Sequence, residues 1–147
     1  MEVSKLKLHK AFITPEQTVI DFLKLGLLAI PVVKDEKPIA YATLTHIIGY
    51  LMPMDVLVHA NAIAKLPGGI ELTKKTFLER FKSGETIGNH TIPLLATVEF
   101  DDPIVKAVSF MLDHRIPIIA VTKGGKYIGY INFECVGSYL SQFNEEE

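Results

Sequence analysis

The chain has 147 residues, of which 48% are hydrophobic, and a formal net charge of −2 at pH 7; this suits one domain, or two half-domains sharing a core, and gives no electrostatic footprint for nucleic acid. Its single cysteine, Cys135, excludes an intrachain disulfide and a cysteine-rich metal site. The longest apolar run, 25–33, is too short to span a bilayer, and the first residues lack the apolar core of a signal peptide, so we expect a cytoplasmic protein that does not bind membranes.

The first predicted element is a helix that starts early in the chain. Residues 14–17 read Thr-Pro-Glu-Gln, which is typical of a capping box with proline at the first helical position. Apolar residues then recur on one helical face until Gly26, which ends the helix. Two strands are predicted next, over 29–33 and 38–43, around a polar turn.

The middle of the chain forms a separate segment over residues 52–87. Apolar residues and alanines over 54–66 predict one helix, and the spacing of the aromatic residues over 73–82 predicts a second. Residues 93–100 are then expected to form a strand that leads into the second half of the chain.

The second half repeats the order of helix, strand, turn and strand. Residues 101–103, Asp-Asp-Pro, predict a helix start with proline just inside the helix. Strands are predicted over 116–121 and 126–131, around a Gly-Gly turn. The helix that precedes these strands carries an apolar stripe at i, i+3, i+4, i+7 and i+8, made of Ile104, Ala107, Val108, Met111 and Leu112.

The two halves share one pattern. Ile-Pro-Val-Val at 30–33 recurs as Ile-Pro-Ile-Ile at 116–119, an offset of 86 (116 − 30), and the strand that starts at Ile39 recurs from Ile128, an offset of 89 (128 − 39). This alignment predicts three extra residues in the second hairpin turn, where insertions are tolerated. The duplication predicts an α/β fold of two pseudo-symmetric repeats, over 1–51 and 88–147, with a helical insert over 52–87 and equivalent clefts between the repeats.

The repeats resemble a known family. The sequence from His114 to Leu140 is similar to the second half of a cystathionine-β-synthase (CBS) domain, and residues 14–22 and 100–112 resemble the entry of that family into its first helix. The resemblance implies a tandem pair, or Bateman module, whose two α/β units pack sheet against sheet and which forms a homodimer. It also implies a sensor that binds AMP, ADP, ATP or S-adenosylmethionine between the repeats and regulates a partner, rather than an enzyme.

The resemblance also implies which residues meet a ligand. The family signature has a Ser or Thr and, three residues later, an Asp, which contact the phosphate side and the ribose hydroxyls. The first repeat has Thr43 and His46 at these positions, and the second has Asn132 and Cys135. Neither repeat keeps the aspartate, and losing such a charged acceptor would weaken ligand binding by about 1.5–3 kcal/mol. Glu134 lies beside the lost position but is expected to point elsewhere.

A basic pair after the second predicted helix is a further candidate. In the family, a basic residue here reaches a ligand phosphate, and the planar guanidinium of Arg115 beside His114 suits that contact. A solvated helix end is the alternative, because cations also favour the C-terminal dipole. The first repeat has Leu and Ala at the positions aligned with this pair, 28–29, so any phosphate binding is expected to favour the cleft with the basic pair. The candidate ligand residues are therefore Thr43, His46, His114, Arg115, Asn132 and Cys135.

Two functions remain open on the sequence. The first is a ligand-sensing module for an adenosyl compound. The second is a ligand-free dimerisation or docking module, with degenerate nucleotide sites and the helices of the insert as its contact surface. Thr43 could equally cap the next helix, and Cys135 could be core filler. The chain has no His-Glu-x-x-His motif and no recognisable nucleophile–base pair, so we expect neither a metal site nor enzyme activity.

Overall fold

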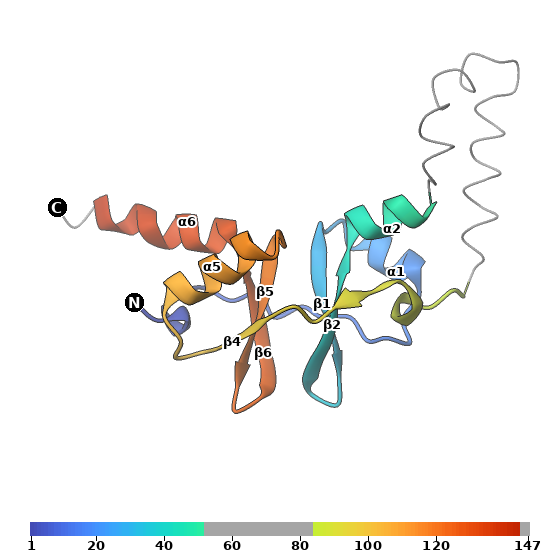
Figure 1. The fold of residues 1–147 in the computed structure, drawn as a ribbon, viewed down its shortest axis with the longest axis horizontal. Coiled ribbons are helices and arrows are strands. Elements are labelled where there is room, and N and C mark those ends of the chain that lie inside the picture. The colour runs from blue at the N-terminus through green and yellow to red at the C-terminus, as the bar shows by residue number, and fades with distance from the viewer. Residues whose placement is uncertain (52–83, 145–147) are drawn as a thin grey trace, which may run out of the picture.

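The structure is a computed structural model that describes residues 1–51 and 84–144. It contains two three-stranded sheets, ordered β1-β2-β3 and β4-β5-β6, which pack on each other through β1, β2, β5 and β6 (Figure 1). The helices lie on the outer sides, which confirms the predicted α/β fold of two pseudo-symmetric units. The bounds are η1 Val3–Lys5, α1 Val19–Lys24, β1 Ala29–Lys34, β2 Lys37–Thr43, α2 Leu44–Leu51, η2 Ile87–His90, β3 Ile92–Pro93, β4 Thr97–Glu99, α5 Ile104–Asp113, β5 Ile118–Lys123, β6 Lys126–Asn132, α6 Phe133–Ser141 and η3 Gln142–Asn144.

A buried tyrosine joins the two sheets. The Tyr41 hydroxyl donates to the Ala96 carbonyl oxygen at 2.6 Å and accepts from the Ala120 amide at 2.9 Å. Burial raises the pKa of Tyr41 to about 12, so the phenol keeps its proton and can make both bonds. A satisfied polar group at this depth fixes how the two units sit on each other.

The two hairpins have the same length, so the predicted insertion in the second turn is wrong. Ala29 pairs with Thr43 in the first hairpin and Ile118 pairs with Asn132 in the second, a constant offset of 89 (118 − 29 and 132 − 43). The extra residues lie in the helix instead, because α1 has six residues and α5 has ten. The two Ile-Pro pairs misled the alignment, since the first lies inside β1 and the second precedes β5.

This offset changes which residues correspond after the helices. His114 and Arg115 correspond to Leu25 and Gly26, rather than to the predicted 28–29. The backbone supports this match, because Gly26 and Arg115 both adopt left-handed conformations, with φ of +67° and +52°. The glycine and the arginine therefore end equivalent helices.

The first helix also begins later than predicted. Residues 14–17 form a turn in which the Gln17 side chain accepts from the Thr14 amide at 2.8 Å, and α1 begins only at Val19. The capping box is formed by Thr18 and Asp21, each of whose side chains accepts from the other's backbone amide at 3.1 Å. The sequence contains two overlapping capping patterns, and the second one starts the helix.

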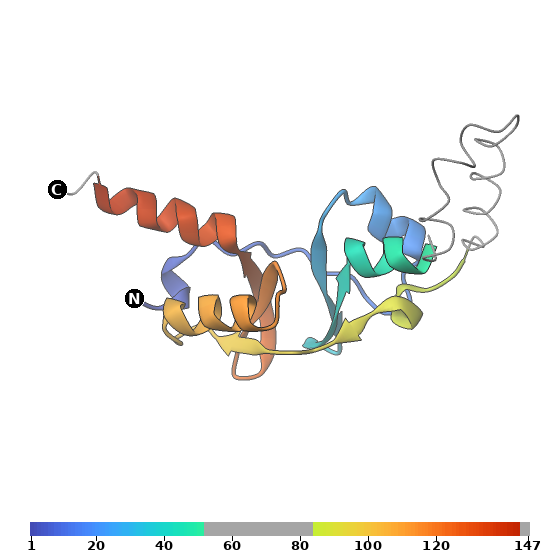
Figure 2. The same ribbon diagram turned by 45° about the horizontal axis from the view of Figure 1, so that its top comes forward.

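Two segments of the chain pass from one unit to the other. Residues 93–100 belong to one of these segments, so the prediction that they form a single strand is wrong. Its start belongs to β3, which pairs with β2, and its later part is β4, which pairs in parallel with β5. The N-terminal segment crosses in the other direction: the Val3 amide donates to the Asp102 carbonyl oxygen before the chain reaches the first unit (Figure 2).

The division at 1–51, 52–87 and 88–147 stays a prediction, and the predicted helices 54–66 and 73–82 lie outside the described residues.

The buried face of α5 is narrower than predicted. Ile104, Ala107 and Met111 are buried, whereas Leu112, at the end of the predicted stripe, is 62% exposed. The buried residues follow i, i+3 and i+7, which is one line along the helix. Leu112 lies beside that line and faces solvent.

Candidate ligand clefts

One cleft collects four of the six predicted ligand residues. This cleft, which we call the Arg115 cleft, has a volume of about 350 Å³. It is formed by the start of α2, the chain that follows α5, and one residue of β3. Its lining residues are Thr43, Thr45, His46, Ile92, His114, Arg115, Ile116 and Pro117.

Thr43 holds the first side of the cleft in place. It is the last residue of β2, and its buried hydroxyl oxygen accepts from the His46 amide at 3.3 Å, as a helix cap does. The capping alternative is therefore observed. It does not exclude ligand contact, because the hydroxyl can still donate its hydrogen into the cleft.

Arg115 holds the second side through an unusual backbone conformation. Its amide donates to the Leu112 carbonyl oxygen at 3.3 Å and the Ile116 amide donates to the Met111 carbonyl oxygen at 3.0 Å, which is a Schellman ending. The left-handed position in this motif usually holds glycine, and another residue there costs about 1 kcal/mol. The first unit has Gly26 at this position, so the arginine indicates a role for the side chain.

The charge of the Arg115 cleft is uniformly positive or neutral. Its basic side chains are His46, His114 and Arg115, and none of the described residues that line it carries a carboxylate. A guanidinium with neighbouring imidazoles and a hydroxyl donor suits an anion, and a phosphate above all. The start of α2 adds the positive end of a helix dipole to the same cleft.

The second unit forms an equivalent cleft of different chemistry, which we call the Asn132 cleft. It has a volume of about 400 Å³ and is lined at the equivalent positions by Asn132 and Glu134 of the second unit and by Gly26. The Asn132 side-chain oxygen accepts from the Cys135 amide at 2.9 Å, so it caps α6. Glu134 contributes to the lining, contrary to the prediction that it points elsewhere. The Asn132 cleft therefore has a carboxylate and lacks the arginine.

Cys135 lies apart from the other predicted residues. It is half-buried and lines a small neighbouring cavity of about 320 Å³, together with Lys5, Lys7 and His9. Sequence reasoning missed Thr45 and Ile92 as lining residues of the Arg115 cleft. A hydroxyl residue at the helix start was a usable signal for Thr45. Ile92 had no local signal, because its place depends on the pairing of β3 with β2.

The described residues contain neither a metal-binding cluster nor a membrane-spanning helix. Within 1–51 and 84–144, no three His, Cys, Asp or Glu side chains cluster so that they could hold a metal ion. No described helix is both long enough and apolar enough to cross a membrane.

Comparison with known proteins identifies the architecture. Residues 91–135 match the family model of the CBS domain. The crystal structure of the CBS-pair protein CBSX2 from Arabidopsis thaliana superposes with a TM-score of 0.71 at 17% identity, covering 98% of this chain and 96% of CBSX2. The chain has the fold of a CBS-domain pair. The predicted resemblance is therefore confirmed. The residues that match the family model include Arg115 and Asn132.

Two further structures have the same CBS-pair fold. A CBS-domain-containing protein of unknown function from Kribbella flavida matches with a TM-score of 0.69 and 16% identity, covering 96% of this chain and 98% of that protein. A structure of CBSX2 in complex with AMP matches with a TM-score of 0.65 and 18% identity, covering 97% and 98%. No curated protein sequence matches this chain at a significant level.

Proposed function

We propose that this CBS pair is a regulatory module that binds an adenine nucleotide, namely AMP, ADP or ATP, in the Arg115 cleft. The observation that carries this function is the convergence of Thr43, His46 and the pair His114–Arg115 on one cleft whose described lining has no carboxylate. The complex of the similar CBSX2 with AMP supports the ligand class. A volume of about 350 Å³ lies at the lower end of the roughly 300–1,000 Å³ found for small-molecule sites.

The lining suggests how each part of the nucleotide is held. The Arg115 guanidinium pairs with phosphate oxygens, and the Thr43 hydroxyl donates to the same group. Ile92, Ile116 and Pro117 offer apolar contacts for the adenine ring. His46 takes the ribose side, where an imidazole can donate or accept one hydrogen bond.

The same charge pattern ranks the candidate ligands. S-adenosylmethionine carries a sulfonium cation and no phosphate, so the three basic side chains of the Arg115 cleft disfavour it. AMP, ADP and ATP each bring the phosphate that Arg115 requires. The Asn132 cleft offers a carboxylate instead of an arginine, so we assign one nucleotide to each chain rather than two.

Nucleotide binding here would act on the whole module. Thr43 and His46 belong to the first unit, whereas His114 and Arg115 belong to the second, so a ligand that contacts both sides stabilises one arrangement of the units. The module would pass that preference to a protein that it regulates. We assign it no catalytic step, and a cytoplasmic location stays a prediction.

Thermal unfolding with AMP, ADP, ATP and S-adenosylmethionine tests this function. A ligand that binds only the folded protein at a hundred times its Kd adds about 2.7 kcal/mol of stability, which is readily measured. We expect shifts with the nucleotides, a much smaller nucleotide-induced shift for Arg115→Ala, and an unchanged shift for the control Lys24→Ala, which removes a cation outside the cleft. Equal shifts for Arg115→Ala and the original protein would contradict the assignment.

A second function is favoured by a different observation. Val105 and Leu112 on α5 are 73% and 62% exposed and lie seven residues apart, so they share one helical face. This face suits a homodimer, either with the nucleotide site or as a ligand-free docking module. Light scattering at micromolar concentration should show a dimer, and Leu112→Asp should convert it to a monomer. A monomer in the original protein would exclude this function.

A further inference from the structure

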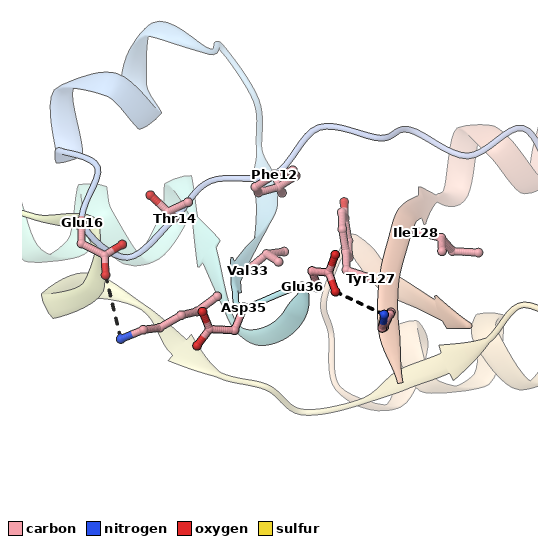
Figure 3. Close-up of a pocket in the computed structure, with 10 residues that line it drawn as sticks. Phe12, Thr14, Glu16, Val33, Asp35, Glu36, Tyr127 and Ile128 are labelled. Carbon is pink, nitrogen blue, oxygen red and sulfur yellow. Dashed lines mark ion pairs between the residues drawn. The ribbon is translucent and has the colours of Figure 1, made fainter. Parts of the chain in front are cut away.

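A third cleft lies between the two hairpins, away from both clefts described above (Figure 3). This hairpin cleft has a volume of about 650 Å³ and shares no lining residue with the Arg115 cleft or the Asn132 cleft. It is bounded by the segment that holds Phe12, by the turn between β1 and β2, and by the start of β6. Its volume lies well inside the range of small-molecule sites.

One wall of the hairpin cleft is aromatic and held rigidly. The Phe12 side chain is 49% exposed, and its ring meets the ring of Tyr127 edge to face, with centroids 5.8 Å apart. The Tyr127 hydroxyl donates to the Ala11 carbonyl oxygen at 2.6 Å, and the Tyr127 amide donates to the Glu36 carbonyl oxygen at 2.7 Å. These bonds hold the wall without a ligand, so a partly exposed aromatic face is ready for one.

One carboxylate at the rim of the hairpin cleft takes no part in the ion pairs there. Lys34 pairs with Glu16 at 3.9 Å, and Lys126 pairs with Glu36 at 3.4 Å (Figure 3). Asp35 lines the same cleft and has no hydrogen bond or ion pair with any described residue. The lining therefore carries three carboxylates and two ammonium groups, and Asp35 is the carboxylate outside the two ion pairs.

We propose that the hairpin cleft binds an organic cation, a primary amine or guanidinium on an apolar or aromatic body. The body packs against Phe12 and Ile128, and the cation pairs with Asp35 at the rim. Nucleotides are disfavoured, because the lining carries one more carboxylate than ammonium groups. The two clefts thus select ligands of opposite charge, and the amine site is independent of the proposed nucleotide site.

Three probes with a shared phenyl body test the charge preference. Phenethylamine is the cation, phenethyl alcohol the neutral form and 3-phenylpropionate the anion, each titrated to millimolar concentration while the backbone amides are followed by NMR. We expect saturable shifts with the amine alone, at residues 33–36 and 126–128. Binding of the alcohol or the anion as strongly as the amine, or no shift with the amine, would overturn the proposal.

Two variants locate the amine site. Asp35→Asn removes the charge and suits the backbone, because φ of Asp35 is +52° and asparagine tolerates left-handed conformations. It should weaken phenethylamine binding about tenfold, which equals about 1.4 kcal/mol, whereas Asp101→Asn, an exposed carboxylate outside the cleft, should not. Phe12→Leu keeps the apolar bulk and should also weaken amine binding. The same spectra verify that both cleft variants are folded. Unchanged amine affinity in both variants would overturn the site. AMP binding should be unaffected in either variant.

Discussion

The Arg115 cleft and the Asn132 cleft occupy equivalent places in the two units but differ in chemistry. At positions 89 apart, Thr43 faces one cleft and Asn132 the other, and Arg115 corresponds to Gly26. The backbone is nearly the same in both, since each cleft has a capped helix start and a left-handed helix end. The two clefts therefore share a backbone framework, and of the two only the Arg115 cleft has an arginine in its described lining.

Residues with a left-handed backbone conformation also differ between the two units. Both units have them at the helix end and in the hairpin turn. Where one unit has glycine the other has a charged residue: Arg115 against Gly26, and residues 35–36 against Gly124 and Gly125. In both cases the charged residues line a cleft. Retaining them against a local conformational cost is what would be expected of ligand-binding residues.

The largest stability difference between the units should lie at Gly129, which corresponds to Ala40. A Cβ on Gly129 would lie 2.8 Å from the His9 carbonyl oxygen and 3.0 Å from the Leu8 Cβ. We expect Gly129→Ala to destabilise the fold by about 1–3 kcal/mol through overpacking. Ala40→Gly should cost only about 0.5–1 kcal/mol. Chemical denaturation of both variants measures this, and equal costs would show that the crossing segments pack alike on the two units.

Arg115→Gly should separate stability from binding. It replaces a left-handed arginine by the residue that the first unit uses, so we expect a gain of about 1 kcal/mol, or a rise of about 2–4 °C in Tm. Nucleotide binding should be weakened at the same time. Arg115→Ala is the matched control, since it weakens binding without relieving the backbone. A lower Tm for Arg115→Gly than for Arg115→Ala would contradict the conformational argument.

The smallest effect concerns the turns before α1 and α5. In the first turn neutral Gln17 accepts from the Thr14 amide at 2.8 Å, and in the second Asp102 accepts from the Glu99 amide at 2.9 Å. This bond, with the ion pair to Lys106, lowers the pKa of Asp102. The lowered pKa contributes stability above the ordinary Asp range, and that stability is lost as pH falls through the lowered value.

Acid unfolding tests this difference. Asp102→Asn should remove a small part of the acid sensitivity of stability, below about 1 kcal/mol for an exposed pair, whereas Gln17→Glu should introduce a similar sensitivity in the first turn. Denaturation midpoints measured between neutral and acidic pH give both slopes. Parallel slopes for Asp102→Asn and the original protein would show that this turn does not titrate.

Much of the fold was predictable, because hydrophobic spacing and turn residues are local signals. The hairpins and α5 could be read in this way, whereas the contribution of Thr43 and Arg115 to a cleft was predicted from the resemblance to CBS domains. The register of the repeats could not, because the Ile-Pro pair at 116–117 resembles the one inside β1 while serving a different place. The split of 93–100 between two sheets, and the hairpin cleft, depend on contacts between distant segments that no local pattern shows.

The difference between the two clefts is tested most directly by calorimetric titration of AMP into the intact chain and into Arg115→Ala. This titration measures the affinity and the stoichiometry together. We expect one AMP for each chain. We also expect Arg115→Ala to lower the affinity ten- to a hundred-fold, since a charged hydrogen bond contributes about 1.5–3 kcal/mol. Two AMP molecules for each chain, or unchanged affinity without Arg115, would contradict the assignment of the nucleotide to a single cleft.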